Sequence, residues 1–174
     1  TSGDLDNQIN SGSYDAFLSK FSPEGKKEWT RLLGSEKDES PYGLNTGSDG
    51  SIYIVGETFG NLDDQTNNGL SDAFITKFNP DGTKDWTRLV GSFSEEGGRS
   101  VTTDSDGSIY LAGYTEGDLD GQVNSGSYDA FLSKFSPEGD KEWTRLFGSA
   151  NQDAIAIQTA LDGSINSIIL LNVD

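Results

Sequence analysis

The feature that most constrains this chain is an internal repeat. The tetrapeptide WTRL begins at Trp29, Trp86 and Trp143, so successive copies are 57 residues apart. The segment SGSYDAFLSKFSPEG occurs unchanged at residues 11–25 and again at 125–139. A repeat of this length is typical of solenoids, propellers and other arrays. We therefore divide the chain into repeat 1 (residues 1–57), repeat 2 (58–114) and repeat 3 (115–174), the last with a degenerate end.

Each repeat contains two turn signals flanked by short segments of strand character. The first is Pro-acid-Gly, at residues 23–25, 80–82 and 137–139, where proline presets one corner and glycine accepts the positive φ that follows. The second is Asp-Gly, at residues 49–50, 106–107 and 162–163, a pair favoured in tight hairpins. No segment holds a helical apolar period. The pattern predicts an all-β chain of four-stranded antiparallel blades, the unit of a β-propeller.

The repeat also resembles a known family. The phrases DAFLSKFSPEG, DAFITKFNPDG and SDGSIYLAGYT are similar to the SBBP class of β-propeller repeats, and the resemblance covers essentially the whole chain. It implies a propeller fold and a secreted or cell-surface bacterial protein. Repeat 3 departs from the pattern at its end, where Asn166 replaces Tyr53 and Tyr110, and Ile169 replaces Gly56 and Gly113. The pairing of the last strand therefore does not follow from the resemblance.

Blades in related propellers are offset from the sequence repeat. On that analogy, residues 41–92 and 99–149 form two complete blades. Residues 14–34 then supply two outer strands, and residues 154–174 supply two inner ones. Closed rings usually have about four to eight blades, and open half-blades expose unpaired strand edges. We expect one partial propeller domain completed by self-association or by further repeats, from a chain that was processed or excised from a longer product.

Composition excludes several classes of function. Twelve basic and 29 acidic residues give a net charge of −17, which disfavours nucleic-acid and membrane-surface partners. No apolar run approaches the roughly 18 residues needed to span a bilayer, so membrane insertion is not expected. The chain contains no Cys, His or Met, which excludes disulfides, thiolate chemistry, imidazole bases and the usual zinc sites.

The most distinctive loop precedes each DAF-type strand and places oxygen-bearing side chains at alternate positions, with an Asp at its end. Its candidate ligands in the three repeats are Asp4, Asp6, Gln8, Asn10 and Asp15; Asn61, Asp63, Gln65, Asn67 and Asp72; and Asp118, Asp120, Gln122, Asn124 and Asp129. Calcium takes about six to eight hard oxygens, so this pattern makes calcium a candidate cofactor. The alternative is plain loop architecture, in which Asp and Asn bond to nearby backbone amides.

A second set of repeated acids follows the WTRL strand. Glu39, Glu96 and Asp153 occupy equivalent positions. We expect them to emerge on the same face as the Asp-rich loops. Such crowding of carboxylates either binds cations or is simply solvated, and the sequence leaves both alternatives open.

The repeated tryptophans have two interpretations. Each Trp is followed two residues later by an arginine, namely Arg31, Arg88 and Arg145, which lies on the same strand face. The pair is explained by packing between blades, with the guanidinium over the indole. The alternative is a sugar-stacking platform.

The repetition also bears on catalysis. Every candidate acid is present three times, whereas an active site normally breaks the symmetry of a repeat, so we expect no enzymatic activity. The sequence favours a structural, adhesive or protein-binding module. The alternative is a multivalent carbohydrate-binding lectin with a glycan ligand.

Overall fold

The computed structural model describes residues 1–150 in full and, beyond them, the backbone of two strands. The described residues form an all-β structure without helices. The strands are β1 (Ala16–Phe21), β2 (Lys27–Leu33), β3 (Glu39–Thr46), β4 (Ile52–Thr58), β5 (Asp72–Phe78), β6 (Lys84–Val90), β7 (Glu96–Thr103), β8 (Ile109–Thr115), β9 (Asp129–Phe135), β10 (Lys141–Phe147), β11 (Asp153–Thr159) and β12 (Ile165–Leu171). No helix among these residues is long and apolar enough to cross a membrane.

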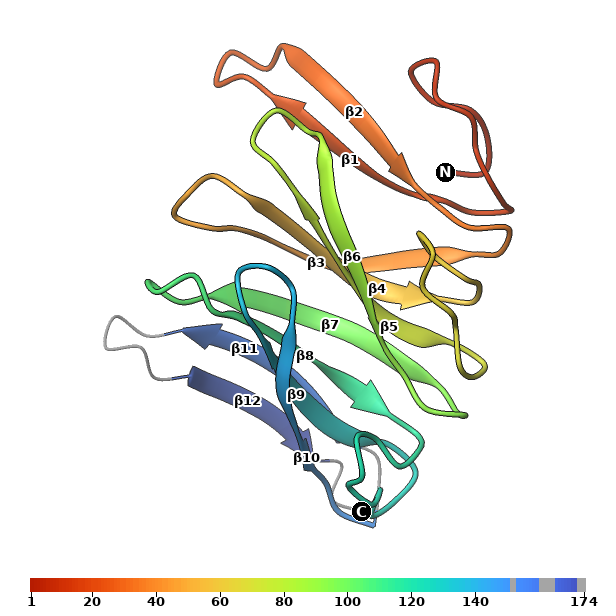
Figure 1. Cartoon of the computed structure of the whole chain (residues 1–174), viewed down its shortest axis with the longest axis vertical. Helices are drawn as coiled ribbons and strands as arrows, with labels where there is room; N and C mark the ends of the chain where they lie inside the picture. Colours follow the sequence, from red (N-terminus) through yellow and green to blue (C-terminus); the bar gives the residue numbers. More distant parts are fainter. Residues whose placement is uncertain (151–152, 160–164, 172–174) are drawn as a thin grey trace.

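The strands form four antiparallel sheets. The two central sheets have four strands each, in the orders β3-β4-β5-β6 and β7-β8-β9-β10. The two terminal sheets have two strands each, β1-β2 and β11-β12. The sheets follow one another along the long axis, with the terminal sheets at opposite ends (Figure 1). The predicted offset between sequence repeat and sheet is therefore confirmed.

The central sheets share a register irregularity that the last sheet lacks. The pairing of β3 with β4 shifts between Pro41 and Gly43, so Tyr42 bulges from the ladder. The pairing of β7 with β8 shifts in the same way at Arg99. β11 and β12 pair without interruption from Asp153 to Thr159. Repeat 3 has one residue fewer between its first strand residue, Asp153, and its Asp-Gly pair. A bulge inserts one extra residue into a strand, so the loss of a residue accounts for the missing bulge.

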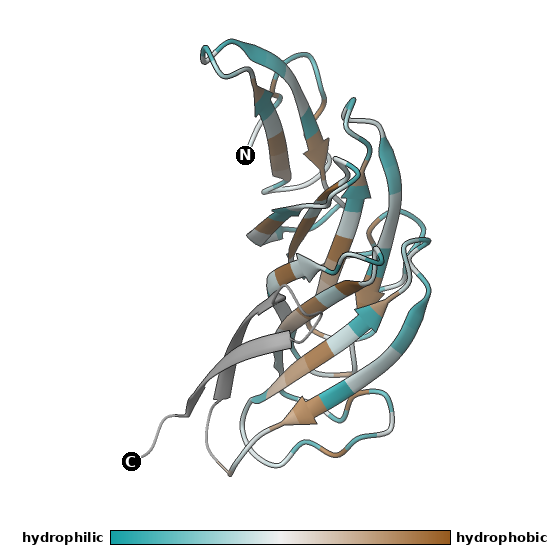
Figure 2. Ribbon diagram, turned by 90° about the vertical axis from the view of Figure 1, so that its left-hand side faces the viewer, coloured by the Kyte–Doolittle hydropathy of each residue, from teal (hydrophilic) through white to brown (hydrophobic). Residues whose placement is uncertain are grey.

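Apolar side chains pack in the spaces between consecutive sheets. Val55 and Ile75 of the first central sheet pack with Leu111 and Phe131 of the second. A second cluster joins β1-β2 to the first central sheet. Figure 2 shows the hydrophobic residues on the strands and the hydrophilic residues at the hairpin turns. Each fully buried aliphatic or aromatic side chain contributes about 1.5–3 kcal/mol, so the stacking of sheets is the main source of stability.

The turn residues have the backbone conformations that the sequence predicts. The glycine of each Pro-acid-Gly turn has a positive φ, between 80° and 85°. Gly50 and Gly107 of the Asp-Gly turns have φ of 82° and 84°. The third Asp-Gly pair, at residues 162–163, lies outside the described residues.

Candidate functional site

The Asp-rich loop before β1, β5 and β9 contains a very tight hairpin. In repeat 1, Leu5 and Gln8 exchange backbone hydrogen bonds of 3.1 and 3.0 Å. The two residues between them, Asp6 and Asn7, have φ of 50° and 61°. Two consecutive left-handed residues define a type I′ turn, which Asp, Asn and Gly adopt most readily. The same reciprocal bonds join Leu62 to Gln65 and Leu119 to Gln122.

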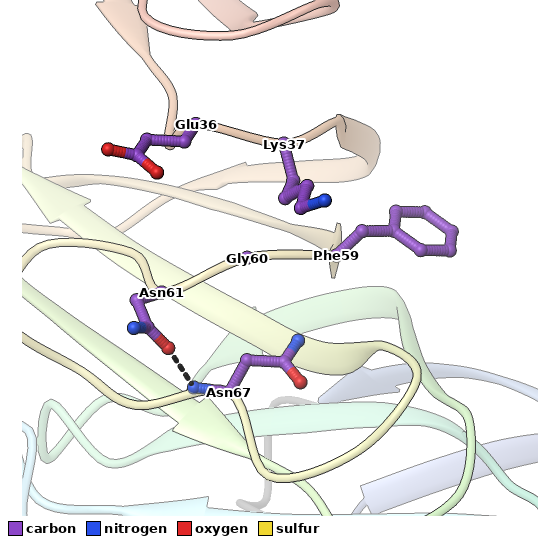
Figure 3. Close-up of a pocket in the computed structure, with 6 residues that line it drawn as sticks. All are labelled: Glu36, Lys37, Phe59, Gly60, Asn61 and Asn67. Carbon is purple, nitrogen blue, oxygen red and sulfur yellow. Dashed lines mark hydrogen bonds between the residues drawn. The ribbon is translucent and has the colours of Figure 1, made fainter.

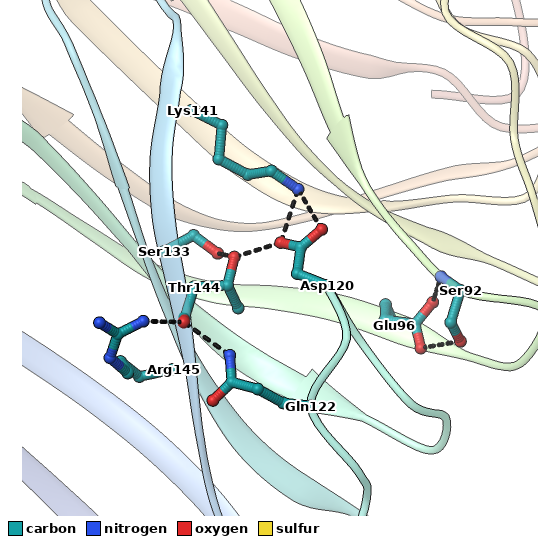
Figure 4. Close-up of polar contacts among 8 residues, drawn as sticks. All are labelled: Ser92, Glu96, Asp120, Gln122, Ser133, Lys141, Thr144 and Arg145. Carbon is teal, nitrogen blue, oxygen red and sulfur yellow. Dashed lines mark hydrogen bonds and ion pairs between the residues drawn. The ribbon is translucent and has the colours of Figure 1, made fainter.

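The first acid of this turn forms an ion pair with a lysine. Lys27 Nζ donates to both carboxylate oxygens of Asp6, at 2.6 and 2.5 Å, and this contact holds the pKa of Asp6 below its ordinary value. Lys141 donates to Asp120 at 2.7 and 2.6 Å, and Thr144 adds a bond of 2.5 Å (Figure 4). Burial acts to raise the pKa of Asp120, but these bonds outweigh it and the pKa is lowered. Asp63 and Lys84 form the corresponding pair.

The amide side chains of the loop also have protein partners. Gln8 Nε2 donates to the Thr30 carbonyl oxygen at 2.6 Å, and Gln8 Oε1 accepts from the Leu32 amide at 3.0 Å. The backbone N–H of Asn10 donates to Asp4 Oδ1 at 3.0 Å, and this bond closes the loop on itself. The equivalent bonds join Asn67 to Asn61 and Asn124 to Asp118. Gln122 repeats the bond of Gln8 through the Thr144 carbonyl oxygen (Figure 4).

The acid that ends the loop is buried and binds the loop backbone. Asp15 accepts hydrogen bonds from the Ser11 and Gly12 amides at 2.8 and 3.2 Å. Burial raises the pKa of Asp72 to about 6, with a smaller contribution from the neighbouring Glu96 carboxylate, although bonds from Asn68 oppose the shift. Asp129 accepts from the Ser125 amide at 2.8 Å. These three acids tie down a turn, as the alternative interpretation of the loop predicts.

The fifteen candidate calcium ligands are thus brought together loop by loop, but the oxygens described above face protein donors. Calcium would have to displace the Lys27 ammonium from Asp6, and the equivalent lysines in the other repeats. Among residues 1–150, no three acidic side chains converge as a metal-binding group. The geometry fits plain loop architecture more closely than a cation site. Calcium binding by these loops stays a prediction.

The second set of acids is buried, so solvation as an explanation was wrong for its two described members. Glu39 accepts hydrogen bonds from Ser35 Oγ at 2.5 Å and Thr58 Oγ1 at 2.8 Å. Burial raises the pKa of Glu39. Glu96 accepts a hydrogen bond from Ser92 Oγ in the same way (Figure 4), and another from Thr115 Oγ1. The side chain of Asp153 lies outside the described residues. These carboxylates close the connection between one sheet and the next.

Packing between sheets explains two of the three tryptophans, as predicted. The Trp29 ring lies against the Gly82 backbone so closely that a Cβ there would approach the ring to 2.9 Å, and Trp86 lies against Gly139 in the same way. The guanidinium carbon of the paired arginine is 5.3–5.5 Å from the indole centroid in all three repeats. Trp143 has no such turn against it within the described part of the chain.

One polar cluster breaks the repeat symmetry. Arg99 lies over the ring of Tyr42, with its guanidinium carbon 3.8 Å from the ring centroid, and 4.8 Å from that of Tyr114. The hydroxyls of Tyr42 and Tyr114 donate to the two oxygens of Glu57, at 2.6 and 2.9 Å. Glu57 is buried and Tyr42 is 47% exposed. We call Tyr42, Glu57, Arg99 and Tyr114 the bulge cluster, because its first and third members are the bulge residues of β3 and β7.

The bulge cluster is rigid and mixed in charge. Burial, followed by the hydrogen bond to Glu57, raises the pKa of Tyr114, so the phenol stays protonated. The Tyr114 ring also packs edge-on against Tyr128, with centroids 5.2 Å apart. A cation between two aromatic rings and a carboxylate bound by two phenols form a preorganised surface. It lacks a free acid–base pair of the kind that hydrolytic chemistry requires.

A shallow pocket of about 510 Å³ lies beside the loop of repeat 2 (Figure 3). It is lined by Glu36, Lys37, Phe59, Gly60, Asn61 and Asn67. The Asn61 side chain is already bonded to the Asn67 amide, at 3.0 Å. Phe59 is 42% exposed and points away from the loop (Figure 3). The pocket therefore offers one lysine and one carboxylate on consecutive residues at the surface, which defines no particular chemistry.

The match to a protein-family model agrees with this all-β repeat architecture. Residues 85–120 match the family model described as SBBP, β-propeller repeat, so the resemblance seen in the sequence is confirmed there. The chain is 29% identical over 168 residues to the protein named regulatory protein FlaEY of Caulobacter vibrioides, an alignment covering 88% of this chain. The chain spans 18% of the length of that protein. A protein of unknown function from Bacteroides caccae has a similar structure, with a TM-score of 0.49 and 9% identity, covering 90% of this chain and 49% of that one.

The bulge cluster was missed by reasoning from the sequence, although a signal was present. Tyr42 and Arg99 occupy the same repeat position, and so do Glu57 and Tyr114. The candidate sites predicted from the sequence consist of residues that recur, whereas this cluster forms where the repeats differ. The contact also joins two sheets, which a strand pattern does not bring together.

Proposed function

We propose that the chain is a non-catalytic β-propeller repeat module of a secreted or cell-surface protein, with a structural, adhesive or protein-binding role. The observation that carries this proposal is a difference between the polar residues that recur in the repeats and the polar residues that do not. The recurring acids and amides described above form hydrogen bonds or ion pairs with other groups of the chain. The bulge cluster, whose Tyr42 ring is exposed and whose Arg99 is half-buried, occurs once, where the repeats differ.

The composition of the bulge cluster suits protein recognition. Tyrosine and arginine are enriched among the residues that contribute most to protein–protein binding. The bonds from Tyr42 and Tyr114 to Glu57 fix these rings before a partner arrives, which reduces the entropy lost on binding. Arg99 supplies a charge that can meet a carboxylate or a carbonyl oxygen of the partner.

Selection of random peptides displayed on phage, against the immobilised chain, tests the proposal. We expect selected peptides to lose at least about tenfold in affinity on Tyr42→Ala or Arg99→Ala, in the range of a binding hot spot. Phe93→Ala is the matched control, because Phe93 is an exposed aromatic residue, at 93%, outside the cluster. Peptides that bind equally well to all three variants would place recognition elsewhere.

A lectin is the second candidate function, and one observation favours it. A pocket of about 370 Å³ is lined in part by Trp143, Asp120, Gln122 and Arg145, an aromatic ring among polar groups. A glycan array distinguishes the two functions. Multivalent sugar binding that is lost on Trp143→Ala supports the lectin, whereas an array without binding supports the protein-binding module.

Calcium stabilisation of the module is tested by melting. If the Asp-rich loops bind calcium, added calcium raises the melting temperature by mass action, and magnesium does so less. The triple replacement of Asp6, Asp63 and Asp120 by Asn removes the gain. Identical melting curves in calcium and in chelator would exclude binding. Lys27 competes with calcium for Asp6, so any gain in melting temperature from calcium should be larger in Lys27→Ala.

A further inference from the structure

The same contact joins consecutive sheets twice within the chain. At the first junction, Arg31 Nε donates to the Gly82 carbonyl oxygen at 2.7 Å, and Lys20 Nζ donates to the Pro80 carbonyl oxygen at 3.3 Å. The Trp29 ring covers Gly82. At the second junction, the corresponding bonds run from Arg88 to Gly139 at 2.8 Å and from Lys77 to Pro137 at 3.3 Å. A Lys-Trp-Arg socket on one sheet thus holds the Pro-acid-Gly turn of the next.

The chain carries a third socket and a third turn, which lie at opposite ends. The third socket consists of Lys134, Trp143 and Arg145, and Arg145 is exposed where Arg31 and Arg88 are half-buried. Its guanidinium keeps the bond to Thr144 at 2.8 Å. No Pro-acid-Gly turn of the described chain lies against this socket, and the pocket beside Trp143 marks the place.

The third turn is the one between β1 and β2, at residues 23–25. A Cβ added to Gly25 would meet nothing within 4 Å, whereas one added to Gly139 would meet the Trp86 ring at 2.8 Å. Gly25 is exposed and Gly139 is buried. Phe17 and Phe21, on the strand that leads to this turn, are 50% and 57% exposed.

The turn at residues 23–25 and the socket at Trp143, here called the free turn and the free socket, match a turn and a socket that pack together within the chain. That packed pair consists of the turn at residues 137–139 and the socket at Trp86. The turn at residues 23–25 belongs to a segment identical to residues 125–139, which contain the turn that Trp86 and Arg88 hold. The free socket contains WTRL, identical to the residues around Trp86. Because the turn Pro-Glu-Gly and the socket residues Lys, Trp and Arg are the same in both pairs, the contact seen within the chain is available between two copies.

We propose that the socket of Lys134, Trp143 and Arg145 binds the Pro23-Glu24-Gly25 turn of a second copy of this chain. In this head-to-tail contact, β1-β2 of one copy lies beside β11-β12 of the other and completes a four-stranded sheet. In such a pair, the turn of each copy binds the socket of the other, so both turns and both sockets are occupied. A heterologous contact of this type closes into a ring when its rotation allows, and the smallest such ring is a dimer. The contact does not depend on protein binding by the bulge cluster, whereas it would occupy the Trp143 pocket that the lectin alternative requires.

Glycine at position 25 provides a selective test. Gly25→Asn keeps a residue that tolerates positive φ, and in the free chain its side chain meets open space. In the proposed contact that side chain collides with Trp143 of the second copy. Gly121→Asn is the matched control, because Gly121 also has a positive φ of 75° and open space, and Asn7 occupies its position in repeat 1.

Sedimentation and native mass spectrometry then measure assembly. We expect the unaltered chain and Gly121→Asn to form a dimer of twice the 18.7 kDa chain. Gly25→Asn and Arg145→Ala, with unchanged circular dichroism, should each weaken association at least tenfold. Mixing these two variants should restore dimers, because one junction of the mixed pair keeps both of its native partners.

Three outcomes would overturn the proposal. The first is a compact monomer of the unaltered chain at high concentration. The second is an assembly that Gly25→Asn leaves intact. The third is a mixture of the two variants that stays monomeric. A larger ring or fibre that Gly25→Asn dissolves supports the contact, because the same head-to-tail junction builds it.

Discussion

Two segments of this chain have the same fifteen residues and different surroundings. Residues 11–25 lie at the end of the molecule, and residues 125–139 lie in a central sheet. Phe17 and Phe21 are 50% and 57% exposed, whereas their equivalents Phe131 and Phe135 are 0% and 1% exposed. The difference shows that burial here depends on the strands and sheets beside the segment and not on its own sequence. An isolated repeat is incomplete, and its stability depends on what stacks against it.

The inner neighbour of the strand accounts for the difference in burial. β9 pairs with β8 on one side and β10 on the other, whereas β1 pairs with β2 and has no strand on its inner side in the described structure. Gly113 of β8 leaves room for the Phe131 ring, since a Cβ there would approach the ring to 2.8 Å. Repeat 3 carries Ile169 at the equivalent position of β12. A sheet completed by β12 therefore needs another position for the ring of Phe17.

Truncation of tryptophans should give the largest contrast between the centre and the end. Trp86 packs against both Gly139 and Tyr53, so Trp86→Ala should lower the free energy of unfolding by about 3 kcal/mol or more. Trp143 keeps its contact with Tyr110 but no turn, so Trp143→Ala should have about half this effect. Chemical denaturation of both variants in the Gly25→Asn background gives the comparison. Equal losses would show that the turn contributes nothing.

The pH dependence of stability should reveal the buried acid at the junction of the two central sheets. The folded-state pKa of Asp72 is raised from 3.8 to about 6. Between these values the folded chain binds more protons than the unfolded chain, so this group lowers stability as the pH rises from about 4 to about 6. The loss is on the order of 3 kcal/mol at most, from about 1.4 kcal/mol for each unit of the shift from 3.8 to about 6.

The matched variant for this measurement is Asp72→Asn, which does not titrate. We expect the difference in unfolding free energy between the two proteins to move in favour of Asp72→Asn as the pH rises through this window. Denaturant titrations at pH 4, 5, 6 and 7 would measure it, with pH values chosen around the two pKa values. A constant difference across these pH values would contradict the raised pKa.

The same glycine substitution at two equivalent turns gives a smaller contrast. Gly139→Asn forces a side chain against Trp86 and should lower the free energy of unfolding by about 1–3 kcal/mol, as overpacking does. Gly25→Asn, measured as a monomer, should not have this overpacking cost, because its side chain meets open space. Both positions have positive φ, so the backbone cost of Asn is shared and cancels in the comparison. Equal melting temperatures would mean that the Trp86 ring moves aside freely.

The smallest expected effect concerns the bulge cluster. Tyr42→Phe removes one hydrogen bond to Glu57 and should lower stability by about 1 kcal/mol. Tyr114→Phe removes the other bond, and the double variant should lose more than the sum if the buried carboxylate is left without partners. Thermal melting of the four proteins measures the coupling. Strict additivity would indicate that water replaces the phenols without loss.

The local structure followed from the sequence because its causes are local. The Pro-acid-Gly turns and the short strands could be predicted, since turn residues and apolar runs act over a few positions. The offset of the sheets followed from the analogy with related propellers. Pairing of Trp86 with Arg88 was also predictable, because residues two apart on a strand share a face. The regular spacing of acids in the Asp-rich loop suggested calcium, whereas in the fold these acids meet Lys27 and its equivalents on the next hairpin.

Contacts between sheets were decided by the tertiary structure alone. The stacking of Arg99 on Tyr42 joins two different sheets, and the buried Glu39 and Glu96 each bind a serine in the connection from the preceding sheet. Their placement depends on the rotation and spacing of successive sheets, which apolar packing fixes over long range. The sequence by itself determined the turns and strands of each repeat. The stacking of the repeats determined which identical residues are buried, which are exposed, and which surfaces remain available to a partner.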